Sequence, residues 1–231
     1  MGGGAVESAF RQGDLTQPDL RLIETLGWDG RNFPRLPLHL ARLARAAAAF
    51  GWPCDPAQAH QAVAKAAPTG PARMRLTLDP QGRVDVQSAP MPAPAAVWRL
   101  ALAAQRLDAA DPWLGVKSTR RAAYDTARAS LPVGVDEAIF ANAAGQVCDG
   151  TITTVFFDAG RGLCTPPVSA GLLPGILRQE MLEKRLCREA DLRADDVPAM
   201  RLWVGNSLRG LIPAVWVDAA AIDEPSSGAD C

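Results

Sequence analysis

Proline and glycine divide the first hundred residues of this chain into short segments with two different hydrophobic periods. Residues 73–78 alternate arginine or threonine with methionine or leucine, which is the period of a strand with one buried face. Residues 38–50 bring apolar side chains together at helical spacing, and Gly51-Trp52-Pro53 ends that helix. A second, alanine-rich helix is expected over 55–66, capped by Asp55. Hairpin strands mixed with helices predict an α+β fold.

Further strands are expected on either side of these helices. Residues 22–26 form a strand candidate, followed by a turn signal at 29–32 and a possible returning strand over 33–36. Residues 84–86 are expected to return after the strand at 73–78. The Ala-Pro-Met-Pro-Ala-Pro segment at 89–94 predicts a linker or an edge passage.

The second half of the chain contains more strand patterns than helical ones. We therefore expect a small N-terminal α+β domain over residues 1–103, a linker over 104–110, and a larger, β-rich C-terminal domain over 111–231. The strands are expected near 97–103, 136–142, 146–148, 155–157, 202–205 and 216–217, and the helices over 121–129 and up to Arg185, with a frayed tail from Asp223.

Composition excludes several classes of function. A formal net charge of -1 argues against a general binder of nucleic acid or of anionic membranes. No apolar stretch is long enough to span a membrane and the N-terminus does not resemble a signal peptide, so a cytoplasmic location is expected. Five widely spaced cysteines without a CxxC pair, and only His39 and His60, make disulfide and metal frameworks unlikely, and we expect no metal site.

Lys117 differs from the other two lysines in its surroundings. It follows the apolar segment Trp113–Val116, whereas Lys65 and Lys184 lie in helical segments where a solvated lysine is expected. Such a lysine is either a buried ion-pair partner or a reactive amine, because desolvation moves a lysine pKa towards the range that Schiff-base chemistry needs. Lys117 alone does not decide between the two.

Four other motifs are candidates for a site around Lys117. Arg42, near the start of a helix, could bind a phosphate, or it could be a surface arginine. The segment 174–178 places a glycine at a helix mouth, which is a possible anion site or a simple helix start. The segment 205–207 could contact an anion or form a plain turn, and Asp149 could pair with a positive ring nitrogen or form a turn. Together they supply what pyridoxal phosphate requires: an amine, an acid and a phosphate cup.

The order of these motifs resembles the class IV aminotransferases, the fold-type IV pyridoxal-phosphate family. The resemblance extends over about residues 21–217 and implies a two-domain fold and a homodimer. The matching segments are Leu22–Leu26, His39–Leu43, Gly115–Tyr124, Asp136–Phe140, Asp149–Thr153, Thr165–Pro167 with Gly171–Arg178, and Gly205–Gly210.

The resemblance also implies roles for single residues. Lys117 stands at the place of the Schiff-base lysine and proton shuttle, and Arg42 at that of the phosphate arginine. Asp149 stands where the family usually has a glutamate that pairs with the pyridine nitrogen, and Thr154 where it often has asparagine. The remaining cofactor contacts implied by position are those of Gly175, Ile176, Leu177, Asn206 and Ser207.

Within the family, residues 117–124 and 206–213 resemble the lyase branch most. That branch converts 4-amino-4-deoxychorismate to 4-aminobenzoate and pyruvate, a step of folate synthesis. Thr25 could help to protonate the leaving group, although an ordinary strand threonine is the simpler interpretation. Candidates for binding the substrate carboxylates are Arg73, Arg75, Arg120 and Arg209.

Two alternatives stay open at this point. One is an aminotransferase that uses the same cofactor on a branched-chain or D-amino acid. The other is a degenerate, non-catalytic member of the family. The second is motivated by Asp149, by Thr154 and by a start over Met1–Asp19 that does not resemble the family's additional first strand.

Overall fold

The structure is a computed structural model that describes residues 10–217. The chain divides into two compact units, with boundaries after Pro92, after Gly115 and after Arg120. Unit 1 contains the first part of the chain together with Val116–Arg120, and unit 2 contains the rest. The first boundary thus precedes the expected one at residue 103, because the strand Trp98–Leu102 pairs with strands of the second unit.

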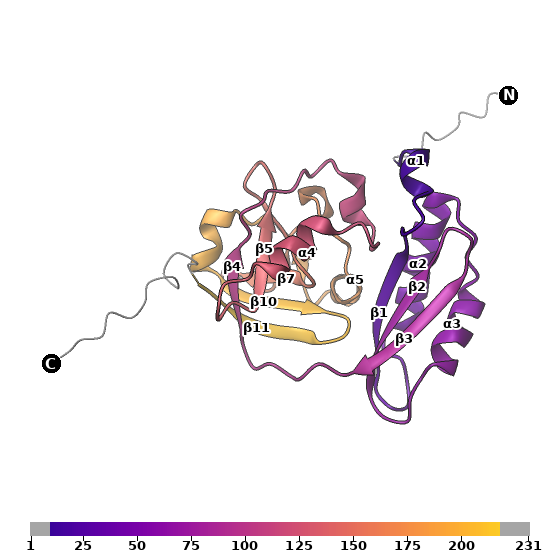
Figure 1. Cartoon of the computed structure of the whole chain (residues 1–231). Coiled ribbons are helices and arrows are strands. Elements are labelled where there is room, and N and C mark those ends of the chain that lie inside the picture. Colours follow the sequence, from indigo (N-terminus) through magenta and orange to yellow (C-terminus); the bar gives the residue numbers. More distant parts are fainter. Residues whose placement is uncertain (1–9, 218–231) are drawn as a thin grey trace, which may run out of the picture. The chain divides into compact units, whose positions relative to one another are not determined.

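Unit 1 is a three-stranded antiparallel sheet with two helices against one face (Figure 1). Leu22, Leu26, Met74 and Leu76 are fully or almost fully buried, as the alternation of apolar residues predicts for a half-covered sheet. The elements are α1 (Gln12–Leu15), β1 (Leu22–Trp28), α2 (Leu36–Phe50), α3 (Pro56–Lys65), β2 (Ala72–Leu78) and β3 (Val84–Pro90), and the strand order is β1-β2-β3.

Two turn residues explain where the helices of unit 1 begin and end. Gly51 closes α2 with a positive φ of 69°, which glycine adopts without steric cost. Asp55 caps α3 by accepting a hydrogen bond from the backbone N–H of Ala57 at 2.8 Å, as the sequence predicted.

The returning strand expected over residues 33–36 is wrong. β1 pairs instead with β2, in a register that sets Leu22 opposite Leu78, so its partner comes from far along the chain. Leu36 already begins α2, with Pro37 in the first turn of that helix. The segment at 89–94 begins as an edge passage, because β3 continues through Pro90.

Unit 2 is built on an eight-stranded mixed sheet in the order β6-β5-β4-β11-β10-β7-β8-β9. Its core contains Leu100, Ile139, Val155 and Val204, and the predicted α+β class is confirmed. The elements are β4 (Trp98–Leu102), α4 (Ala122–Ala129), β5 (Glu137–Ala141), β6 (Val147–Gly150), β7 (Thr154–Asp158), β8 (Cys164–Thr165), α5 (Ile176–Glu183), β9 (Arg188–Glu189), β10 (Arg201–Asn206) and β11 (Gly210–Trp216), with 3-10 turns at Pro112–Gly115, Val168–Ala170 and Ala194–Ala199.

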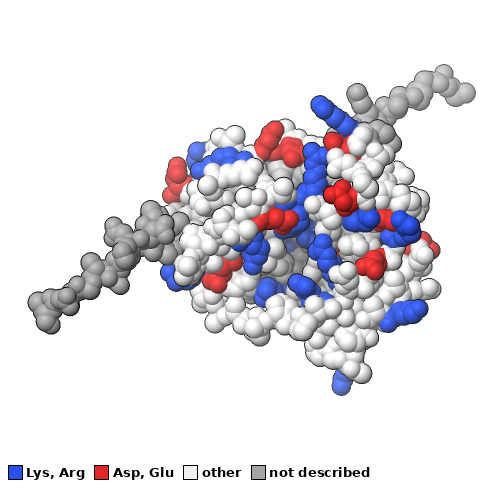
Figure 2. All heavy atoms as spheres, viewed as in Figure 1, with Lys and Arg blue, Asp and Glu red and all other residues white. Residues whose placement is uncertain are grey.

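The surface charge and the helix lengths agree with what the composition predicts. Figure 2 shows acidic and basic side chains interspersed on the face in view. Over residues 10–217, no helix is both long and apolar enough to cross a bilayer. The frayed tail predicted from Asp223, and Cys231, lie outside the described residues.

Candidate active site

Lys117 lies on a segment that extends the sheet of unit 1. Its carbonyl oxygen accepts a hydrogen bond from the backbone N–H of Ile23 at 2.8 Å, and Ser118 forms an antiparallel bridge with Leu22. The N–H of Thr119 donates to the carbonyl of Arg21 at 2.9 Å. Residues 117–119 therefore run along the edge of β1, and the half-buried Lys117 has a backbone fixed by that pairing.

β1 also holds a buried acid that binds two residues of α2. The Glu24 carboxylate, 2% exposed, accepts hydrogen bonds from Arg42 Nε at 2.8 Å and Arg42 Nη2 at 2.6 Å. His39 Nδ1 lies 2.6 Å from the second oxygen of the same carboxylate. This fork fixes the guanidinium plane of Arg42, since a bidentate pair defines orientation as well as distance.

The charge state of Glu24 follows from these contacts. Burial alone would raise the pKa of its carboxyl, but the charge of Arg42 and the hydrogen bonds from His39 and Arg42 outweigh burial and lower the pKa to about 2. The interpretation of Arg42 as a surface arginine is wrong, because that residue is buried. Sequence reasoning missed Glu24, although an acid at a buried strand position between Leu22 and Leu26 was a usable signal.

Thr25 lies on the opposite face of β1 from Glu24, because successive strand residues point to opposite faces. Its partner across the sheet is Arg75, and Arg73 lies opposite Gly27 on the same face. Two of the four arginine candidates are thus neighbours of Thr25. Of the other two, Arg120 pairs with Asp14 at 3.2 Å, and Arg209 lies over the Trp98 ring at 5.2 Å from its centroid.

The start of α5 in unit 2 has the form of an anion cradle. Its N-cap is Gly175, and the helix has no side-chain cap among the described residues. The first-turn N–H groups of Ile176 and Leu177 have no partner inside a helix and carry the positive end of its dipole. A Cβ at Gly175 would lie 2.7 Å from Thr154 Oγ1, so any larger residue there would require the Thr154 side chain to shift.

The end of β10 meets this cradle through a second glycine. A Cβ at Gly205 would lie 2.7 Å from Leu177 Cδ2 and 2.6 Å from the carbonyl oxygen of Gly210. Asn206 Nδ2 donates to the carbonyl of Ile152 at 3.1 Å, and Asn206 Oδ1 accepts from the N–H of Leu208 and of Arg209. Asn206 therefore shapes the turn that carries Ser207. The expected contacts Gly175, Ile176, Leu177, Asn206 and Ser207 all lie in unit 2.

Asp149 is a buried acid at the end of β6, 6% exposed. Burial first, and the charge of Asp149 second, raise the pKa of the Tyr124 phenol on α4 and also that of the Cys148 thiol, the latter to about 12. The Tyr124 ring packs edge-on against Phe140 of β5, with centroids 5.1 Å apart. Asp149 thus stands beside a phenol and a thiol that both stay protonated at neutral pH.

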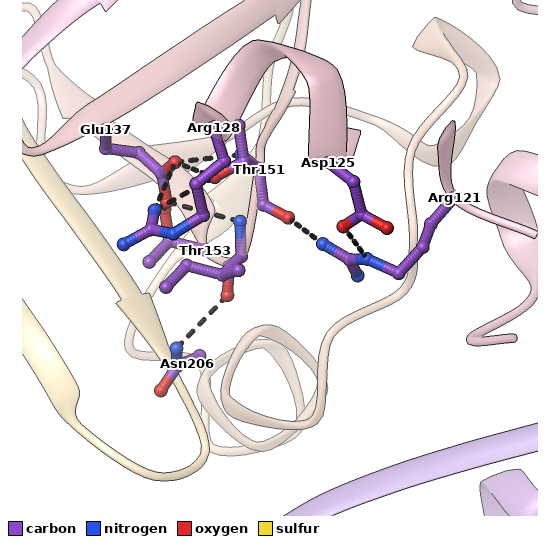
Figure 3. A network of polar contacts seen from close by, with 8 residues as sticks. Arg121, Asp125, Arg128, Glu137, Thr151, Thr153 and Asn206 are labelled. Atoms are coloured by element: carbon purple, nitrogen blue, oxygen red, sulfur yellow. Dashed lines mark hydrogen bonds and ion pairs between the residues drawn. The ribbon is translucent and has the colours of Figure 1, made fainter. Parts of the chain in front are cut away.

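The residues that follow Asp149 are bound to a second buried acid, Glu137 of β5 (Figure 3). Its carboxylate accepts hydrogen bonds from Thr151, Ile152 and Thr153 and lies 3.5 Å from Arg128 Nη1. Burial raises the pKa of Glu137, and these hydrogen bonds and the Arg128 charge only partly oppose that rise. Sequence reasoning missed this network, because Glu137 reads as one polar residue in an apolar strand.

These features fit a cofactor with a phosphate and a positively charged ring nitrogen. The start of α5, which has no side-chain cap, offers N–H donors for a phosphate, as helix N-termini do in general. The buried carboxylate of Asp149 suits a protonated ring nitrogen, since a buried charge requires a partner of opposite sign. Lys117 supplies a primary amine.

Comparison with known proteins identifies the family. The family model described as amino-transferase class IV matches residues 21–216. The chain belongs to this family. Class IV aminotransferases and aminodeoxychorismate lyases are pyridoxal-phosphate enzymes, so the chain is an enzyme and its family's cofactor is the one that the cradle and the buried acid fit.

Individual relatives carry two kinds of name. A protein of Schizosaccharomyces pombe provisionally named an aminodeoxychorismate lyase is 31% identical over 177 residues, which are 74% of this chain and 76% of the relative. A solved structure from Mesorhizobium loti, provisionally named an amino-acid aminotransferase, is 43% identical, has a TM-score of 0.82, and matches 86% of this chain and 100% of its own.

A more distant structure supports the fold. The 4-amino-4-deoxychorismate lyase of Pseudomonas aeruginosa has a TM-score of 0.74 at 21% identity, with 86% of this chain and 83% of its own covered. At this identity the likeness concerns the fold alone. The resemblance drawn from the sequence motifs is therefore confirmed at the level of family and fold.

Proposed function

We propose that this chain is a pyridoxal-phosphate-dependent 4-amino-4-deoxychorismate lyase that forms 4-aminobenzoate and pyruvate. The observation that carries the proposal is the lyase-like pair of segments 117–124 and 206–213, one carrying Lys117 and the other Ser207. The name of the Schizosaccharomyces pombe relative supports the same reaction. By the same resemblance we propose a homodimer that serves folate synthesis, and from the sequence composition we propose a cytoplasmic location.

The proposed phosphate contacts come mainly from unit 2. We assign the phosphate to the N–H groups of Ile176 and Leu177 and the hydroxyl of Ser207. By the family resemblance, Arg42 is our candidate for the phosphate arginine. Gly175 and Asn206 shape this cradle, the first by lacking a Cβ beside Thr154 and the second by fixing the turn around Ser207. The fork with Glu24 orients Arg42 before any ligand binds, which lowers the entropic cost of binding.

Each catalytic residue has one task in this scheme. When bound, pyridoxal phosphate supplies an aldehyde for exchange with the substrate amine and a ring that stores an electron pair. Asp149 keeps the ring nitrogen protonated through a charge-assisted hydrogen bond. The amine of Lys117, released by the exchange, accepts the proton from the amine-bearing carbon of the substrate.

Bond cleavage then needs one more proton. The C–O bond to the enolpyruvyl group breaks, the remaining ring becomes aromatic, and the departing oxygen is protonated to give enolpyruvate, which tautomerises to pyruvate. The hydroxyl of Thr25 is our candidate donor, and Arg75, directly opposite it in the sheet, is a candidate contact for a substrate carboxylate. A dianionic substrate favours such arginines.

Transamination of an amino acid is the second candidate. It uses the same cofactor and the same roles for Lys117 and Asp149, and it is favoured by the name of the Mesorhizobium loti structure, which is 43% identical to this chain. The two reactions differ after the proton has left the substrate carbon: the lyase breaks a C–O bond, and the aminotransferase returns the proton to the cofactor side.

One assay separates them. Purified protein with pyridoxal 5'-phosphate is given 4-amino-4-deoxychorismate, and pyruvate and 4-aminobenzoate are measured in parallel with a Lys117→Ala variant. The lyase proposal predicts equal amounts of both products, lost in the variant. No pyruvate from the wild type, together with formation of pyridoxamine phosphate from D-alanine or a branched-chain amino acid, would reject the lyase in favour of the aminotransferase.

A further inference from the structure

We propose that Glu137 is a positioning residue for Asp149, acting through the loop Gly150–Thr153, whose donors its carboxylate binds. The inference rests on the proposed function, because the proposed cofactor contains the ring nitrogen that Asp149 would contact. Glu137 itself touches neither substrate nor cofactor in this proposal. It fixes the backbone next to Asp149, the acid that we assign to the ring nitrogen and call the ring acid below.

The carboxylate of Glu137 collects the donors of three consecutive residues. Oε1 accepts from the backbone N–H of Thr151 at 3.0 Å and from the Thr151 hydroxyl. Oε2 accepts from the N–H of Ile152 at 3.2 Å and from Thr153 Oγ1 at 2.9 Å. A carboxylate has about four acceptor positions, and this loop fills them with four donors.

The carbonyl groups of the same loop are bound from other directions. Thr151 O accepts from Arg121 Nη2 at 2.9 Å, and Arg121 in turn bonds Asp125 at 2.7 Å on α4 (Figure 3). Ile152 O accepts from Asn206 Nδ2 at 3.1 Å. Thr153 O accepts from the N–H of Gly150 at 2.7 Å, so the loop is closed on itself as well.

Gly150 explains how closely the loop lies on Glu137. A Cβ at this position would be 2.6 Å from Thr153 Oγ1 and 3.1 Å from Glu137 Cδ. Any other residue would push the loop away from the carboxylate. Asp149 precedes this glycine directly, so a shift of the loop would move the carboxylate that we assign to the ring nitrogen.

The other end of the loop reaches the phosphate cradle. Thr154 follows Thr153 directly, and its Oγ1 lies against Gly175 at the start of α5. One buried carboxylate therefore sets the positions of the ring acid at one end and of a cradle wall at the other. A carboxyl group with 0% exposure is costly to bury, and a turn that only connects two strands does not require one.

The test compares Glu137→Gln with Asp158→Asn. Gln keeps the shape of Glu, but its amide nitrogen cannot accept the two loop hydrogen bonds that one of the carboxylate oxygens accepts. Asp158 is the matched control because its carboxylate also ties a loop of unit 2, through the N–H groups of Gly160, Arg161 and Gly162, outside the proposed site.

Three readouts are measured on each full-length variant. Without cofactor, hydrogen exchange of peptides covering 149–154 should become about tenfold faster in Glu137→Gln and stay unchanged in Asp158→Asn, as expected for a lost charge-assisted bond. The Kd of pyridoxal 5'-phosphate should rise about tenfold in Glu137→Gln only. The midpoint pH of the visible absorbance of the bound cofactor should also shift only in that variant, because the ring acid has moved.

The outcomes separate the inference from the proposed function. Unchanged exchange over 149–154 in Glu137→Gln would overturn the inference. Faster exchange with a wild-type Kd and a wild-type absorbance midpoint would overturn it too, since the loop would then be structural only. If the wild type itself bound no pyridoxal 5'-phosphate, the proposed function would fall, and the exchange data alone would decide whether Glu137 holds the residues around Asp149.

Discussion

At the scale of single residues, two glycines show how the cradle in unit 2 depends on the absence of a Cβ atom. Gly175 and Gly205 both have φ values that other residues can adopt, so backbone conformation does not explain them. Close approach does, because a Cβ at either position would collide with Thr154 or Leu177. Glycine here brings the end of β10, the start of β7 and the start of α5 close together.

This predicts the effect of a single methyl group. Gly175→Ala should weaken binding of pyridoxal 5'-phosphate about tenfold. The new Cβ would lie 2.7 Å from Thr154 Oγ1, so it would displace that oxygen and distort the helix start. Adding Thr154→Ala should restore part of the affinity by removing the colliding oxygen. Gly70→Ala is the control, since no atom lies within 4 Å of a Cβ there. Equal cofactor titrations for Gly175→Ala and the wild type would contradict this account.

At the scale of elements, β1 organises unit 1 from both of its edges and both of its faces. One edge pairs with β2 and the other with residues 117–119. One face presents Glu24 to Arg42 and His39 of α2, and the other carries Thr25. A single strand thus positions the backbone of the candidate Schiff-base lysine, the candidate phosphate arginine and the candidate proton donor.

Much of this could be predicted from the sequence, and the rest could not for one physical reason. Helix α3 and strand β2 follow from their own hydrophobic periods and their caps, which are local properties. The pairing of β1 with β2, and the network of Glu137 with Arg128 and Thr151, join segments far apart in the chain. Local patterns do not encode such pairings, so residues 33–36 were wrongly expected to return as a strand, and Glu24 and Glu137 were missed.

The edge pairing of residues 117–119 gives an element-scale prediction. Thr119 Oγ1 accepts from the N–H of Arg21 and donates to the carbonyl of Asp19, both at 3.0 Å. Thr119→Val should remove about 1 kcal/mol of local stability, which corresponds to about fivefold faster hydrogen exchange of peptides covering 116–120. Exchange of β2 should not change in the same experiment. A wild-type exchange rate at 116–120 would mean that the hydroxyl does not hold the lysine segment.

At the scale of the whole molecule, each unit contains one almost fully buried glutamate among residues 10–217, and the pKa values of these two residues move in opposite directions. Glu24 in unit 1 has its pKa lowered to about 2, although burial opposes this, since Arg42 and His39 stabilise its charge. Glu137 in unit 2 has its pKa raised, because burial prevails over its hydrogen bonds and over Arg128. Folding stability must therefore depend on pH with opposite signs at the two sites.

The sign at each site defines the window in which it acts. The charge of Glu24 stabilises the folded state above its ordinary pKa of 4.5, and about 3 kcal/mol is lost as pH falls from 4.5 towards 2. Glu137 contributes stability that is complete below 4.5 and is lost as pH rises through its raised folded pKa. The two windows meet at the ordinary pKa of a glutamate, so the combined contribution of the two residues to stability is largest near that pH.

Urea unfolding followed over a pH series can separate the two contributions. Glu24→Gln should be destabilised by about 3 kcal/mol or more at pH 7, and its difference from the wild type should shrink as pH falls below 4.5, because the wild type loses the same term there. For Glu137→Gln, the free energy of unfolding should fall below that of the wild type by the largest amount in acid. This difference should become smaller as pH rises. Differences that stay constant over the whole series would show that neither carboxyl titrates with folding. Exchange of the two patterns between the variants would mean that burial prevails at Glu24 and that the hydrogen bonds prevail at Glu137.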